Sequence, residues 1–216
     1  MEQALFDFII VVLGILFALF LNRINEKRKH KKRIHSIMTI VVANMNKDLA
    51  NLKWVIKDID HKIGLFNKLQ KEILMSEEEL KECMHFAIDY PTFVIAKRGY
   101  NLLNDARVDF EFKGSRLISR IILHYDMFMP MLERHDNLET NQAEENHRLF
   151  FNLTFSSDYY NNTLSEEMKK YMQTNDYLNM AEYFLCGLRN DYKKHLESLR
   201  HSILYTLQEI DKSDFK

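Results

Sequence analysis

The sequence predicts an all-α protein in which an N-terminal transmembrane helix continues into a long stalk helix, followed by a cytoplasmic antiparallel helical bundle. Two observations indicate this class: the chain begins with an apolar segment, and apolar residues then recur three and four positions apart along two long segments. A third is the low content of five Gly and two Pro in 216 residues, which favours long helices over a turn-rich β fold. We expect an anchor at 1–22, a basic juxtamembrane segment at 23–33 and a helical domain at 34–216.

The apolar segment at 4–21 has the length and composition of a membrane-spanning helix. Its sequence is ALFDFIIVVLGILFALFL, in which Asp7 is the one charged residue. As a helix it would extend roughly 27 Å, close to the thickness of the hydrocarbon core of a bilayer. A cleaved signal peptide would begin with basic residues and end at small ones, whereas this chain begins with Glu2 and the segment ends at Leu21. We therefore predict a retained single-pass anchor.

A cluster of basic residues follows the anchor directly. Seven Lys or Arg side chains stand against one acidic residue, Glu26; they are Arg23, Lys27, Arg28, Lys29, Lys31, Lys32 and Arg33. By the positive-inside rule this predicts an N-terminus outside and a domain in the cytoplasm. The membrane is expected to be a bacterial inner membrane. The same cations can bind anionic lipid headgroups. Binding of nucleic acid by this segment is the alternative.

Three residues of the anchor are candidates for contacts between helices in the bilayer. Gly14 and Ala18 are four positions apart, a pair of small residues that lets helix backbones approach closely. Asp7 lies seven positions before Gly14, and the helical period places it near the same face. Because carboxylates avoid lipid, we predict a closed homo-oligomeric ring with Asp7 facing inward. The alternative is that Asp7 reaches the membrane interface and has no role in assembly.

The domain at 34–216 is predicted to contain two long helices that bracket shorter ones. The stalk helix runs from Ile34 to Ile73, and a second long pattern at 176–210 is expected to pack back along it. A capping box at Ser76–Glu79 predicts the start of another helix that ends near position 89. The remaining predicted elements are a helix at 92–105 that is interrupted or ends near Gly99, a turn at 112–115 with Ser115 as a helix cap, helices at 116–129 and 131–151 separated at Pro130, and a loop at 152–165.

Few residues suggest chemistry. The chain has no Gly-rich phosphate loop, no Ser or Cys nucleophile motif and no Cys/His spacing typical of zinc. Acid-x-x-His pairs, which build di-iron sites in helical bundles, occur three times, at Asp58/His61, Glu82/His85 and Glu144/His147. No partner glutamates accompany these pairs. We therefore expect no metal, no cofactor and no small-molecule substrate.

The segment Arg189–His195 contains an Arg, an Asn and a His in an order that resembles the R-N-x4-H motif of HEPN ribonucleases. In that chemistry His195 would exchange a proton with the reacting oxygen and Arg189, which precedes Asn190, would neutralise charge on the phosphate. On an unbroken helix the two lie about 9 Å and 240° apart, so they converge only if the helix breaks near Cys186–Gly187. The alternative is that His195 is a half-buried structural residue and Arg189 a surface cation.

The stretches FIIVVLGILFALFLNRINEKRKHKKR and KDLANLKWVI resemble an uncharacterised family of single-pass membrane proteins common in Bacteroidota. The overall pattern is also similar to the single-span accessory protein of type VI-B CRISPR systems, which has a degenerate HEPN domain. This resemblance implies a non-enzymatic, oligomeric accessory of antiviral defence that perturbs membranes or forms a pore. Its partners would be the membrane, further copies of itself, and an RNA-guided RNase effector or RNA. The alternatives are a membrane-tethered HEPN-type RNase and a non-catalytic scaffold or sensor.

Overall fold

The computed structural model describes residues 2–86, 89, 91–109, 116–151 and 156–213. For residues 2, 4–9, 107–109, 150, 151 and 156 it describes the backbone alone. These parts of the chain are helical and contain no strand, which confirms the all-α class. The elements are α1 (Glu2–Gln70), α2 (Glu77–Met84), α3 (Arg98–Asp109), α4 (Arg116–Phe151), α5 (Ser156–Asn161), α6 (Glu166–Met172), α7 (Asn175–Gly187), the π-helical turn η1 (Leu188–Tyr192) and α8 (Lys193–Asp211).

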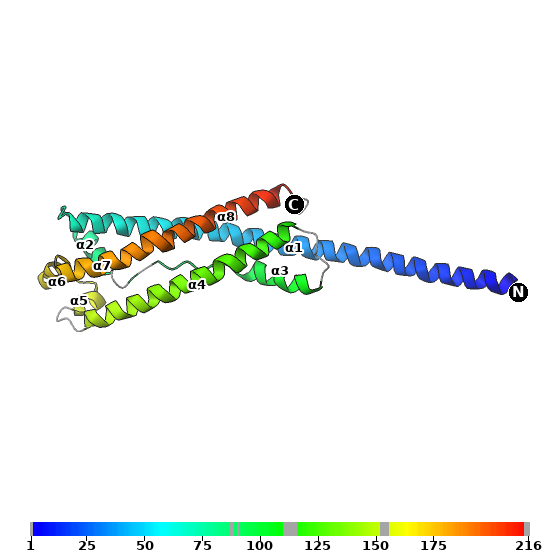
Figure 1. Ribbon diagram of the computed structural model, residues 1–216, viewed down its shortest axis with the longest axis horizontal. Helices are drawn as coiled ribbons and strands as arrows, with labels where there is room; N and C mark the ends of the chain where they lie inside the picture. Colours follow the sequence, from blue (N-terminus) through cyan, green and yellow to red (C-terminus); the bar gives the residue numbers. More distant parts are fainter. Residues whose placement is uncertain (1, 87–88, 90, 110–115, 152–155, 214–216) are drawn as a thin grey trace.

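Helix α1 is one unbroken helix of 69 residues, which corresponds to roughly 100 Å. The predicted continuity of the anchor and the stalk is therefore confirmed at the level of the backbone. Its N-terminal part projects alone beyond the other helices, whereas its C-terminal part lies among them (Figure 1). Among the residues whose side chains are described, which leave out 4–9, no helix is long and apolar enough to cross a membrane.

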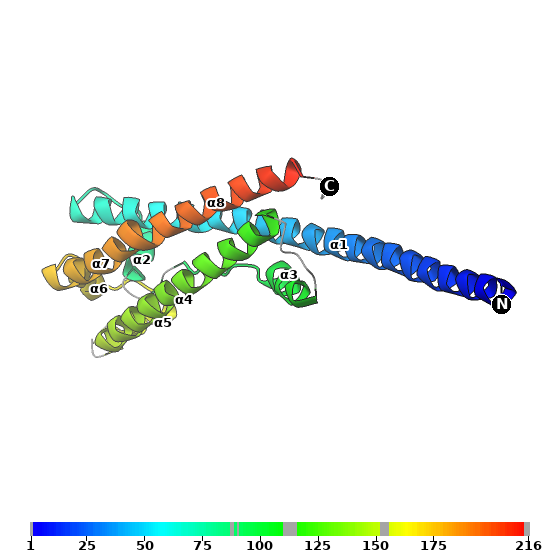
Figure 2. The same ribbon diagram turned by 45° about the vertical axis from the view of Figure 1, so that its right-hand side comes forward.

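The bundle is antiparallel, as predicted, because α8 returns along α1 from the far end of the molecule. Helix α4 lies beside α8 and runs in the opposite direction, and α3 packs between α4 and α1 (Figures 1 and 2). The core is made by one face of each long helix. On α1 this face includes Val41, Met45, Leu52 and Ile59, all fully buried.

Helix α3 docks against α1 through its first turn. The prediction of a helix at 92–105 that is interrupted or ends near Gly99 is wrong, because the helix begins at Arg98 and continues through Gly99. Helix α3 begins at Arg98, and a Cβ atom on Gly99 would lie 2.8 Å from the Cα of Val41. The backbone N–H of Gly99 donates to Oδ1 of Asn44 at 2.7 Å, and that of Ala96 donates to Oδ1 of Asp48 at 3.0 Å. Side chains of α1 thus satisfy one of the unpaired donors in the first turn of α3 and one donor just before the helix.

Other predicted boundaries need correction. The capping box at Ser76 and Glu79 forms, but α2 ends at Met84 and not near position 89. The two helices predicted on either side of Pro130 are the single helix α4. Helix α5 lies within the predicted loop at 152–165, and α6 follows it with Ser165 as its cap. The predicted turn at 112–115 lies outside the described residues.

The C-terminal pattern predicted at 176–210 forms α7, η1 and α8 without a break. Within η1 the helix has more residues per turn than an α-helix, and the N–H of Lys193 donates to the carbonyl of Leu188, five residues earlier. Leu188, Tyr192 and Leu196 follow one another at intervals of four and are all buried. On a regular α-helix, two successive intervals of four residues would rotate the third side chain away from the direction of the first. The π turn has more residues per turn, which keeps all three side chains in the core.

Candidate functional site

The residues of the HEPN-like motif lie where α7 passes through η1 into α8. Arg189 is exposed and lines a small pocket against α1, next to Asn67. His195 is half-buried, and its Nδ1 lies 2.6 Å from Nε2 of His135 in α4. Arg189 and His195 therefore lie beside different helices, and within one chain they do not surround a common phosphate-sized site.

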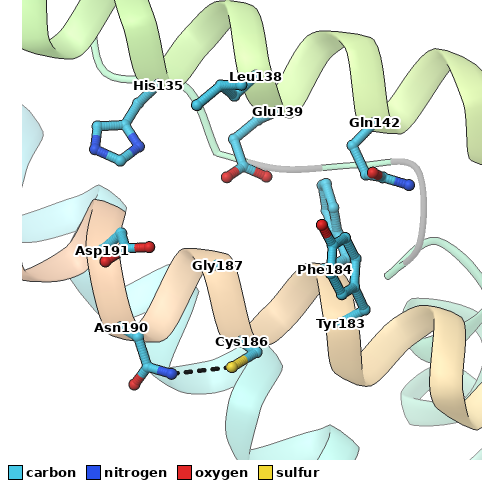
Figure 3. A pocket seen from close by; sticks show the side chains of 10 residues that line it. All are labelled: His135, Leu138, Glu139, Gln142, Tyr183, Phe184, Cys186, Gly187, Asn190 and Asp191. Atoms are coloured by element: carbon cyan, nitrogen blue, oxygen red, sulfur yellow. Dashed lines mark hydrogen bonds between the residues drawn. The ribbon is translucent and has the colours of Figure 1, made fainter.

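The helix break that would let Arg189 and His195 converge does not form. Gly187 has helical angles of φ −58° and ψ −49°, and the helix continues through η1. Asn190, the middle member of the motif, donates from Nδ2 to Sγ of Cys186 at 2.9 Å, on the side of the helix away from α4 (Figure 3). The exposure of Arg189 and the half-burial of His195 match the alternative of a surface cation and a structural histidine.

A cavity of about 390 Å³ lies between α4 and the α7–η1 segment (Figure 3). Helix α4 contributes His135, Leu138, Glu139 and Gln142. The opposite wall contributes Tyr183, Phe184, Gly187 and Asp191. The Glu139 carboxylate points across the cavity toward Gly187, where a Cβ atom would stand 3.4 Å from its Oε1 (Figure 3). The absence of a side chain on Gly187 thus leaves room beneath the carboxylate.

The cavity is electrostatically unusual for the interior of a bundle. Glu139 is only 9% exposed, and burial, together with the charge of Asp191, raises its pKa to about 7. Burial and the proximity of His195 lower the pKa of His135, which lies at the same end of the cavity as Asp191 (Figure 3). At neutral pH the site therefore combines a carboxyl group poised between its two protonation states with an imidazole that favours its neutral form.

Sequence reasoning missed this cavity, although α4 contains a signal for it. The buried apolar positions of its first half are Ile118, Ile121, Ile122, Tyr125, Phe128 and Leu132. The same spacing of three and four then continues with polar residues: His135, Glu139, Gln142 and Asn146. The helix boundary predicted at Pro130 separates the two halves of this face, so the spacing is not recognised as one continuous pattern.

The N-terminal candidates lie on the projecting part of α1. Ala18 is exposed, and a Cβ atom on Gly14 would meet nothing within 4 Å. The side chain of Asp7 lies outside the described ones. All seven cations of the basic segment at 23–33 are exposed.

The acid-x-x-His pairs assemble differently from a di-iron site. His61 and Glu82, from two different pairs, are in contact, with 2.7 Å between Nε2 and Oε2. Within the described part of the chain, no group of three or more His, Cys, Asp or Glu side chains is arranged to hold a metal ion.

Comparisons with known proteins do not identify a relative: no protein-family model, no curated protein and no solved structure matches the chain.

Proposed function

We propose that this chain is a single-span membrane protein whose non-catalytic helical domain is held close to the bilayer by α1. The observation that carries the proposal is the uncovered apolar surface of α1 at 10–21. Ten large apolar side chains in this range are between 36% and 62% exposed. Successive residues of a helix turn by about 100°, so these side chains surround it on every side. A helix that is apolar all round is stable in an apolar medium, and no other described element covers this one.

The sequence extends this surface to the length of a membrane span. Residues 4–9 precede it and contain one charge, so the apolar segment comprises eighteen residues. The exposed cations at 23–33 follow at the end nearer the bundle. This order supports insertion with the N-terminus outside and the bundle in the cytoplasm, where the cations contact anionic headgroups.

The surroundings of Arg189 and His195 support a non-catalytic domain. A phosphodiester reaction needs the imidazole and the guanidinium close to the same phosphate. Arg189 lines a pocket with residues of α1, whereas His195 contacts His135 of α4. The domain is accordingly better suited to binding than to bond cleavage, which favours a scaffold or sensor.

Cell fractionation tests the anchor. The natural chain, expressed in a bacterium, should stay in the membrane fraction after an alkaline carbonate wash. The double variant Leu16→Lys/Phe17→Lys should be released, because each charge at the centre of a span costs about 2.5–3.5 kcal/mol. Leu123→Lys/Met127→Lys is the matched control, since these α4 side chains are equally exposed but belong to the bundle. Equal release of both variants, or a natural chain already in the soluble fraction, would contradict the proposal.

A reporter fused after Lys216 tests the orientation and should report a cytoplasmic location. Neutralising the cations of the basic segment should give a mixture of orientations. The substituted residues are Lys27, Arg28, Lys29, Lys31, Lys32 and Arg33. A periplasmic signal from the unmodified fusion would reverse the proposed orientation and leave the anchor itself intact.

The roles in assembly and in antiviral defence stay predictions. Native mass spectrometry of the detergent-solubilised chain tests assembly, and Gly14→Leu should weaken any oligomer that packs through the small-residue face. An RNA cleavage assay tests the alternative of a tethered RNase. Activity lost in both Arg189→Ala and His195→Ala would favour that alternative, with the two residues meeting between copies.

A further inference from the structure

The cavity between α4 and the α7–η1 segment contains a buried charge that the described chain does not neutralise. None of the described donors or cations bonds the carboxylate of Glu139, which is only 9% exposed. Its oxygens border the cavity and are not fully buried, but a carboxylate largely removed from water is costly to ionise without a partner. A charged partner for the Glu139 carboxylate would therefore have to enter through the cavity.

A second carboxylate faces the same space from the opposite wall. Asp191 of η1 lines the cavity, and its charge acts on Glu139 across it. Figure 3 shows the two side chains extending from different helices into one gap. Like charges placed together create a negative potential that is strongest where water is excluded. Such a site attracts a cation.

The remaining lining favours an organic cation. Leu138 is apolar and 53% exposed at the rim, and the rings of Tyr183 and Phe184 lie at the end nearest Gln142 (Figure 3). Aromatic faces attract cations and cover apolar groups. The volume of about 390 Å³ falls in the range typical of small-molecule sites. A bare metal ion would leave most of this space and its apolar wall unused.

Among the described residues, no group of three or more His, Cys, Asp or Glu side chains is arranged to hold a metal ion, and one ring nitrogen of His135 is already in contact with a neighbouring histidine. Nε2 of His135 lies 2.6 Å from Nδ1 of His195. The two carboxylates that remain are fewer than the ligands that a divalent cation requires. We propose that this cavity binds a small organic ammonium ion, with its charge between Glu139 and Asp191 and its apolar part against the aromatic end. The site does not depend on the proposed membrane insertion.

The pH dependence of binding follows from the groups around Glu139. Facing it across the cavity are Asp191 of η1 and Tyr183 of α7, and His135 lines the cavity from its own helix. The pKa of Glu139 is raised to about 7, so the carboxylate becomes fully ionised above neutral pH. Aliphatic ammonium groups keep their charge there. Affinity should therefore rise as the pH increases from about 6 to about 8.

Isothermal titration calorimetry of the full chain in detergent tests the proposal with three probes: benzylamine, phenethylamine and 1,4-diaminobutane. At least one should bind, and 2-phenylethanol, the neutral analogue of phenethylamine, should bind at least about tenfold more weakly. The variant Glu139→Gln should lose about tenfold or more in affinity and lose the pH dependence. Asp191→Asn should weaken binding less, because its side chain is more exposed. Glu144→Gln, an exposed change on the same helix, is the control and should bind as the natural chain does.

Several results would overturn the proposal. They are the absence of binding by all three amines at millimolar concentration, equal binding of the neutral analogue, and unchanged affinity in Glu139→Gln. Misfolding of that variant is checked by its melting temperature, which should rise because an unpaired buried charge is removed. Loss of fold in Glu139→Gln would itself contradict the idea that the carboxylate serves a ligand, and Asp191→Asn would still report on the site.

Discussion

The N-terminal and C-terminal parts of α1 belong to one continuous helix but lie in different surroundings. Between 10 and 21 the large apolar side chains are all at least 36% exposed, and they point in every direction. Between 34 and 69 the apolar side chains lie on one face, where Val41 and Leu52 are fully buried, and this part of the chain packs against α3 and α8. The opposite face of this second part is mainly polar, with Trp54 as a 63% exposed exception.

This difference shows that helix formation and helix environment are separate properties of the sequence. Both parts of α1 contain helix-forming residues, no Pro and one Gly each, Gly14 and Gly64, so the backbone is the same throughout. The distribution of apolar residues around the axis is what differs. One apolar face indicates packing against protein, and apolar residues on all sides indicate an apolar medium.

The largest expected effect on the free energy of unfolding is the difference between truncating an apolar side chain in one part of α1 and truncating one in the other part. Leu52→Ala should lower the free energy of unfolding by about 2–5 kcal/mol, because it leaves a cavity in the core. Leu16→Ala removes a 56% exposed side chain and should change it by less than about 0.5 kcal/mol. Urea unfolding of the full chain in micelles, followed by circular dichroism, measures both. Similar losses would mean that the N-terminal part packs against the bundle.

A smaller effect is expected from two glycines that differ in their surroundings. Gly99→Ala should destabilise the protein by about 1–3 kcal/mol, since the new Cβ atom would lie 2.8 Å from the Cα of Val41 and would push α3 away from α1. Gly64→Ala should stabilise it by about 0.5–1 kcal/mol, because nothing lies within 4 Å of the new atom in mid-helix. The same unfolding assay measures both. Opposite signs are the prediction, and equal signs would contradict the close contact of α1 with α3.

The smallest effect concerns Asp48, which joins α1 to the start of α3. Burial raises its pKa from 3.8 to about 6, so the folded protein binds a proton more readily than the unfolded chain. The carboxyl group therefore adds stability as the pH falls from about 6 to about 4, and this contribution is lost as the pH rises again. Asp48→Asn should gain about 1–2 kcal/mol relative to the natural protein between pH 4 and pH 7. A difference that is independent of pH would show that Asp48 is not desolvated.

Much of the fold could be predicted because it depends on local spacing. The pattern from Ile34 onward located the stalk, and Ser76 with Glu79 located the start of α2. The prediction of two helices separated at Pro130 was wrong because proline usually ends a helix, whereas here it lies inside α4. It is exposed on α4, so the carbonyl that loses its hydrogen bond can bond water and the helix continues.

The candidate site could not be predicted from the sequence because it depends on contacts between helices across the bundle. Glu139 and Asp191 come from helices whose relative placement no local pattern specifies. The partner of His195 was hidden for the same reason, since His135 lies sixty residues earlier in the chain. Arg189 and His195 share a motif, yet Arg189 in η1 lines a pocket with residues of α1, whereas His195 in α8 contacts His135 of α4.

The most direct test of the account asks which part of α1 contacts lipid, using tryptophan quenching by brominated lipids in vesicles. Trp54 is the single natural tryptophan, and the variant Phe17→Trp/Trp54→Phe moves it about 55 Å along the same helix. We predict strong quenching at position 17 by bromine atoms in the acyl chains and none at position 54. Quenching at neither position would contradict the central claim that the uncovered part of α1 enters the bilayer.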